Sequence, residues 1–167
     1  VSCVMPFGES PGEEEDLSNV SFGPKLRGLE LMNLSSALIL NLMKAAVGSR
    51  ALTTLTVLMH GSLDDECLQV LLGLLEKVHL KNLTFDLDMA QLLPKLACLN
   101  EVQLLDITSL KCETTEEKVH FEKLLRKNTL KSLRLVWCDL CPNLCDALTA
   151  GFESMSELRE LTINASS

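Results

Sequence analysis

Apolar residues between Leu130 and Glu157 change spacing once, from the period of a strand to the period of a helix. The first part reads L-x-x-L-x-L-x-x-C-x-L, and this alternation is typical of a strand with one buried face. After Cys141 the apolar residues fit one face of a helix, at Leu144, Cys145, Leu148 and Phe152. A strand and a helix within 28 residues cannot bury their apolar faces alone. The pattern therefore predicts neighbouring units of the same kind.

The same leucine template recurs along the chain and predicts six strand starts. The steps between the starts are 26, 28, 19, 31 and 28 residues, which favours the helix-containing class of repeat. The 19-residue third step is too short for a long helix, so we expect a short helical turn from Ala90 to Leu93 that stops near Pro94. The template matches are Leu26/Leu29/Leu31, Leu52/Leu55/Val57, Leu80/Leu83/Phe85, Leu99/Val102/Leu104, Leu130/Leu133/Leu135 and Leu158/Leu161/Ile163.

Polar residues predict where three of the helices begin. Ser35 is placed to cap the first, acidic residues open the second at Asp64-Asp65-Glu66, and Thr114 with Glu117 matches a capping box for the fourth. The predicted buried stripes are Leu38, Ile39, Leu42, Met43 and Ala46 in the first helix, Leu68, Leu71, Leu72 and Leu75 in the second, and Val119, Leu124 and Leu125 in the fourth.

Residues 1–24 differ in composition from the rest and are interpreted as an acidic loop or disordered leader. They hold five acids, including Glu13-Glu14-Glu15-Asp16, and no Lys or Arg, so they carry most of the net charge of −8. Residues 25–167 form the predicted repeat domain. Because the chain starts at Val1 and stops after a predicted strand, we expect it to be truncated from a longer protein.

The repeat from Leu130 resembles the cysteine-containing repeats of the ribonuclease inhibitor class, in which a second Cys follows the first by seven positions. Leu130, Leu133, Leu135, Cys138, Leu140, Cys145 and Leu148 match that pattern. The class is shared with NOD-like receptors and with intracellular scaffold and ubiquitin-ligase receptor proteins. The resemblance implies an α/β fold, a leucine-rich repeat solenoid or horseshoe with a curved parallel sheet and outer helices. It implies a protein-protein interaction module, part of an adaptor or ubiquitin-ligase receptor, with a NOD-like receptor sensor as the alternative.

Candidate chemistry in the sequence is sparse, and we do not expect an enzyme. The spacing of Cys138, Cys141 and Cys145 raises the alternative of a zinc or thiol site, but small buried repeat positions explain it more simply, so we predict no metal and no cofactor. No nucleotide-binding or metalloprotease motif occurs, and His60, His79 and His120 lie in different repeats. The mildly acidic repeats argue against nucleic acid. Lys123, Arg126, Lys127 and Lys131 form one local basic spot.

The odd count of seven cysteines favours free thiols in a reducing, cytoplasmic compartment. No apolar run is long enough for a membrane span. We therefore expect no membrane partner. Four sequons, at Asn19, Asn33, Asn82 and Asn164, keep a secreted protein as the less favoured alternative.

Residues between the template positions of each strand should form the concave face, where we expect a protein partner rather than a small-molecule substrate. Trp137 is the only tryptophan and is a candidate interface anchor if it is exposed. The predicted partner-binding residues are Glu30, Met32, Leu58, Asp86, Glu101, Gln103, Arg134, Val136, Trp137 and Glu160.

Overall fold

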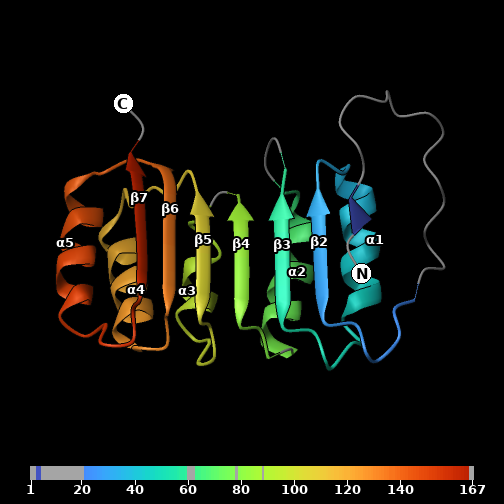
Figure 1. The fold of residues 1–167 in the computed structure, drawn as a ribbon. Coiled ribbons are helices and arrows are strands. Elements are labelled where there is room, and N and C mark those ends of the chain that lie inside the picture. The colour runs from blue at the N-terminus through green and yellow to red at the C-terminus, as the bar shows by residue number, and fades with distance from the viewer. Residues whose placement is uncertain (1–2, 5–20, 60–62, 78, 88, 166–167) are drawn as a thin grey trace.

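The computed structural model describes residues 3–4, 21–59, 63–77, 79–87 and 89–165, which form an α/β structure around one parallel sheet (Figure 1). Sheet order follows chain order from β1 to β7. The helices lie on one side of the sheet, and no helix of the described residues covers its other side (Figure 1). The strands are β1 (Cys3–Val4), β2 (Gly28–Met32), β3 (Thr54–Leu58), β4 (Asn82–Asp86), β5 (Leu104–Thr108), β6 (Ser132–Cys138) and β7 (Glu160–Ala165). The helices are α1 (Ser36–Ala46), α2 (Asp65–Lys77), α3 (Leu93–Leu96), α4 (Thr115–Arg126) and α5 (Pro142–Phe152).

The strands pair without offset, so each template residue lies beside the template residue of the next unit. Leu29 pairs with Leu55, Leu55 with Leu83, and Leu83 with Leu105. Burial alternates along β2, β3 and β4, with the second and fourth residues of each strand buried. The period-2 pattern therefore places the aliphatic residues on the helix side of the sheet, as predicted.

Side-chain caps start two helices where the sequence predicts them. Ser35 Oγ accepts a hydrogen bond from the Leu38 N–H at 3.4 Å. At α4, Thr114 Oγ1 accepts from the Glu117 N–H at 3.2 Å while Glu117 Oε2 accepts from the Thr114 N–H at 2.8 Å. These bonds satisfy backbone donors that have no partner within the helix, which confirms the predicted capping box.

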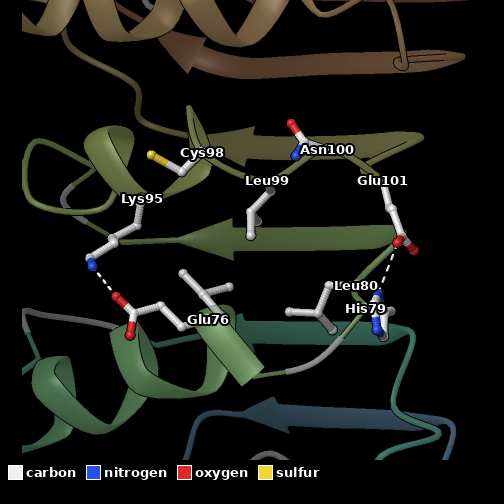
Figure 2. Close-up of a pocket in the computed structure, with 9 residues that line it drawn as sticks. Glu76, His79, Leu80, Lys95, Cys98, Leu99, Asn100 and Glu101 are labelled. Carbon is white, nitrogen blue, oxygen red and sulfur yellow. Dashed lines mark hydrogen bonds and ion pairs between the residues drawn. The ribbon is translucent and has the colours of Figure 1, made fainter.

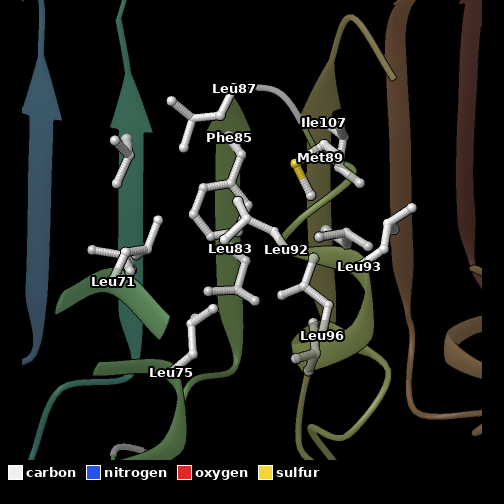
Figure 3. Close-up of a cluster of buried hydrophobic side chains, with 14 of the residues drawn as sticks. Leu71, Leu75, Leu83, Phe85, Leu87, Met89, Leu92, Leu93, Leu96 and Ile107 are labelled. Atoms are coloured by element: carbon white, nitrogen blue, oxygen red, sulfur yellow. The ribbon is translucent and has the colours of Figure 1, made fainter. Parts of the chain in front are cut away.

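One apolar core runs between the sheet and the helices. Its central part brings Phe85 of β4 and Ile107 of β5 against Leu92, Leu93 and neighbouring residues of the short α3 unit (Figure 3). Phe85 and Phe121 are the largest side chains that are fully buried among the described residues. The core is continuous because the apolar face of each strand packs against the helix layer and beside the apolar faces of its neighbouring strands.

The fourth template match is wrong by three residues. β5 starts at Leu104, and its buried residues are Leu105 and Ile107, preceded by buried Val102. The step from Leu80 to Val102 is 22 residues rather than 19, and the next step is 28 rather than 31. The reason is the Leu104–Leu105 pair, which offers an apolar residue in either register; pairing with β4 selects the one that buries Leu105.

The short helix is also shifted from its predicted position. α3 begins at Leu93, and Pro94 lies in its first turn rather than ending it. Proline is tolerated there because the first N–H groups of a helix have no intrahelical acceptor. Three predicted apolar helix positions turn out to be exposed: Val119, Cys145 and Phe152. Phe121 takes the core position in α4, and Ala147 and Gly151 take it in α5.

Two residues of the predicted leader take part in the sheet. β1 pairs in parallel with β2, with Cys3 beside Leu31 and Val4 beside Met32. The acidic run at residues 13–16 and His60 lie outside the described residues. Among the described residues, no helix is both long and apolar enough to cross a membrane.

Candidate protein-binding surface

The uncovered side of the sheet, which we call the open face, carries three residues from each of β2 to β7. They form three rows across the sheet because the strands pair in register. The first row is Gly28, Thr54, Asn82, Leu104, Ser132 and Glu160; the second is Glu30, Thr56, Thr84, Asp106, Arg134 and Thr162; the third is Met32, Leu58, Asp86, Thr108, Val136 and Asn164.

Most of the predicted partner-binding residues lie on the open face. Glu30, Arg134 and Glu160 are among the charged ones, with Asp86, and Met32, Leu58 and Val136 contribute apolar area in the third row. Glu101 and Gln103 do not lie on the open face. The predicted template match that places them in a strand is wrong by three residues. Both precede β5, where Gln103 adjoins the first strand residue and Glu101 lies in the loop. Leu104 and Asp106 occupy the corresponding positions on the open face, and the predicted register missed both.

Acidic groups predominate on the open face. Its carboxylates are Glu30, Asp86, Asp106 and Glu160, whereas Arg134 is the one cation in the three rows. Arg134 Nη1 lies 3.8 Å from Asp106 Oδ2 on the neighbouring strand. Burial raises the pKa of Asp106, and the Arg134 charge opposes that shift. A surface with this excess of acceptors favours a partner that supplies cationic groups and hydrogen-bond donors.

Trp137 lies at an irregularity between β6 and β7, and its side chain is 62% exposed. The register shifts there, so that Val136 pairs with Asn164 but Cys138 pairs with Ala165. Trp137 itself has a φ of 52°, a left-handed conformation that is unusual for a bulky residue. Strict alternation would have placed Trp137 on the buried side with Leu133 and Leu135. The left-handed backbone at this position exposes the indole and places Cys138 in the core instead.

A cleft of about 510 Å³ lies beside α3, at the margin where the strands begin. Two ion pairs flank it: Lys95 with Glu76 on one side, and His79 Nδ1 with Glu101 Oε1 at 2.8 Å on the other (Figure 2). Leu80 and Leu99 lie between these pairs (Figure 2). The four-residue α3 is much shorter than the eleven to thirteen residues of the other helices, which explains the hollow.

One wall of this cleft is fixed by a lysine from the next unit. Lys127 Nζ donates to the Leu99 carbonyl oxygen at 2.7 Å and to Asn100 Oδ1 at 3.0 Å. Burial lowers the pKa of Lys127. The polar groups of the cleft are thus largely engaged with one another, and the sequence offered only the short step as a signal of its presence.

The three cysteines considered for zinc do not converge on one point. Cys141 Sγ donates to the Cys112 carbonyl oxygen at 3.0 Å, whereas Cys138 Sγ is directed to Val136 and Cys145 Sγ to Leu140, each at 3.6 Å. Among the described residues, no group of three or more His, Cys, Asp or Glu side chains is arranged to hold a metal ion. Cys138 is buried as the repeat pattern predicts, but Cys145 is exposed, which corrects its assignment to a buried position.

The two described histidines are each paired locally. His79 faces Glu101 across the cleft, and His120 Nε2 lies 3.6 Å from Glu116 Oε1 within α4. Two residues of the predicted basic spot are engaged in different interactions. Lys127 donates to the Leu99 carbonyl oxygen in the loop before β5, and Arg126 pairs with Glu122 within α4.

No protein-family model matches the chain, and a search of the curated proteins finds no match.

Proposed function

We propose that this chain is a leucine-rich repeat solenoid that serves as a protein-recognition module, and that its partner binds the open face. The open face is the concave face in this proposal. The observation that most directly supports it is the side of the parallel sheet that no described helix covers, whose three rows of partly or fully exposed residues mix acids, threonines and apolar side chains. In a stack of repeats, such a face offers a broad surface whose residues vary without disturbing the core.

The composition of the open face supports a protein partner in two ways. Apolar side chains of the third row, with the exposed Trp137 at its edge, provide area that loses water on binding. Carboxylates at the centre and at both ends of the sheet favour a partner with basic residues, and they would speed its approach through long-range attraction. We infer that the module is the recognition part of an intracellular adaptor or ubiquitin-ligase receptor.

The test is an affinity capture from cell lysate with the whole chain and with a face variant that carries Arg134→Glu, Trp137→Ala and Glu160→Lys. A matched control carries Lys123→Glu, Val119→Ala and Glu153→Lys, which make the same kinds of change at exposed positions of the helix layer. We expect a specific protein to be retained by the chain and by the control but lost from the face variant, with all three equally folded by circular dichroism.

The proposal is overturned if the face variant retains the same proteins as the unmodified chain, or if the control loses them equally. The identity of a protein lost only from the face variant decides the pathway. Components of a ubiquitin ligase or its substrates support the adaptor assignment. Capture of a nucleotide-binding domain supports the NOD-like receptor alternative instead.

A further inference from the structure

Basic residues recur at one position of the repeat, immediately before the first residue of each strand. This position holds Arg27, Lys81, Lys131 and Arg159 before β2, β4, β6 and β7, and all four are exposed. Thr53 and Gln103 occupy it before β3 and β5. Only 15 of the 167 residues are Lys or Arg, so four in six such positions is a strong enrichment. We call these six residues the strand-start row.

The backbone of the strand-start row is fixed by a repeated hydrogen-bond pattern. The carbonyl oxygen of each residue accepts two N–H groups from the next unit, as when Arg27 O accepts from Thr53 N at 2.8 Å and Thr54 N at 3.1 Å. The same pair of bonds recurs from Thr53, Lys81, Gln103 and Lys131 to the units that follow them. The six positions therefore lie at the starts of adjacent strands, about 4.8 Å apart from one to the next.

Neither helix ends nor internal ion pairs account for these cations. Basic residues are favourable in the last turn of a helix, but the strand-start row lies outside every helix. Among the described residues, no ion pair or side-chain hydrogen bond uses the charged groups of the four cations. Acids near this margin are Glu76 and Glu101, which pair with Lys95 and His79, and Glu153, Glu157 and Glu160 near the β7 end.

The opposite margin of the sheet has the reverse charge. Strand ends and helix starts there carry Asp64, Asp65 and Glu66 before and within α2, and Glu116 and Glu117 within α4. The start of every strand lies at the other margin (Figure 1). A ligand with negative charge is therefore attracted to the strand-start row and repelled from the far side of the sheet.

The spacing of the cations selects an extended ligand. Arg27, Lys81 and Lys131 lie two strands apart from one to the next, which is about 9.6 Å at the spacing of paired strands. A polyproline II segment has three residues per turn and rises about 3.1 Å per residue, so acids at every third position recur on one side at about 9.3 Å. We propose that the strand-start row binds an extended acidic segment of a partner protein, with a carboxylate at each of these three cations.

A labelled peptide of four Glu-Pro-Pro units tests this assignment by fluorescence anisotropy with the full chain. We expect binding that weakens as salt is added, because exposed charges are screened over about 10 Å at 0.1 M ionic strength. The variant Lys81→Glu/Lys131→Glu should lose at least about tenfold in affinity, since it replaces two attractions by two repulsions. The matched control Lys111→Glu/Lys123→Glu has the same net charge, alters exposed lysines outside the row, and should bind within about twofold of the unmodified chain.

Four results would overturn the proposal. Absence of peptide binding at low salt would remove the site, and equal loss in the control variant would show that only net charge matters. A peptide of the same composition with its four Glu residues adjacent should bind more weakly. Equal binding would mean that the spacing of the carboxylates does not affect binding to the strand-start row. Tighter binding of a single-stranded oligonucleotide of equal charge would assign the row to nucleic acid.

The outcome is separable from that of the proposed function. The open-face variant Arg134→Glu/Trp137→Ala/Glu160→Lys leaves Arg27, Lys81 and Lys131 in place, so it should still bind the Glu-Pro-Pro peptide. Conversely, Lys81→Glu/Lys131→Glu keeps the open-face rows intact. Failure of peptide binding would overturn the strand-start row proposal without affecting the capture experiment. Failure of the capture experiment would overturn the open-face proposal without affecting the peptide result.

Discussion

β6 and β7 carry the same leucine template in two different environments. Leu133 and Leu135 of β6 are fully buried, whereas Leu161 and Ile163 of β7 are 44% and 38% exposed. The two strands pair directly, with Leu133 beside Leu161 and Leu135 beside Ile163. No helix follows β7 in the described part of the chain. A template residue is therefore buried by the segments that follow its strand, and the template alone does not determine its contribution to stability.

The largest expected effect comes from truncating the same template position in the two strands. Leu133→Ala removes a fully buried side chain and should lower the free energy of unfolding by about 2–5 kcal/mol, from lost burial and the cavity left behind. Leu161→Ala should cost less than about 1 kcal/mol because solvent already reaches that side chain. Urea unfolding followed by circular dichroism measures both. Equal losses would contradict the comparison.

Glycines in two helices extend the comparison to the helix layer. A Cβ atom on Gly151 of α5 would lie 2.6 Å from Leu125 Cβ of α4, whereas one on Gly73 of α2 would meet nothing within 4 Å. We expect Gly151→Ala to destabilise the chain by about 1–3 kcal/mol through overpacking. Gly73→Ala should stabilise it by up to about 1 kcal/mol because alanine is the better helix former. Thermal unfolding of both variants decides this, and a stabilising Gly151→Ala would show that α4 and α5 are loosely packed.

The sequence allows prediction of the α/β structure with one parallel sheet and of most of the open face, because the period of apolar residues is a local property. It fails where two registers are nearly equivalent. Leu104 and Leu105 both fit the template, and only pairing with β4 decides between them, so Glu101 and Gln103 were assigned to the face in place of Asp106. The exposure of Trp137 depends on a left-handed backbone conformation at the end of its strand, and the cleft depends on the length of a neighbouring helix. Neither feature is determined by the residues of one short segment.

Buried thiols on the covered side should make the fold sensitive to alkali. Burial raises the pKa of Cys112 to about 12 and that of Cys67 to about 11, from an ordinary value of 9.0. A raised thiol pKa means that the unfolded chain loses its protons first, so this part of the stability is complete below pH 9 and is lost as pH rises towards 11–12. The chain has no tyrosine, which removes phenol ionisation from the same range.

Urea midpoints at about pH 8 and about pH 10.5 measure this loss, and Cys112→Ala should reduce the difference between them. Lysines ionise in the same range, so the unmodified chain and the variant are compared at each pH. A pH dependence that is unchanged in Cys112→Ala would show that the Cys112 thiol makes no contribution.

The smallest expected effect is at Trp137, where the junction between β6 and β7 departs from the other junctions. Asn33 after β2 and Ser109 after β5 hold the equivalent position with φ values of 56° and 62°, so the left-handed conformation belongs to the repeat rather than to tryptophan. Asparagine adopts that conformation readily, whereas it is unfavourable for a bulky residue such as tryptophan. Trp137→Asn should therefore change stability by less than about 1 kcal/mol, while Trp137→Val, which is β-branched, should cost about 1–2 kcal/mol. If Trp137→Asn were the more damaging of the two, the indole would contribute to packing, and its selection as an interface anchor would lose its main support.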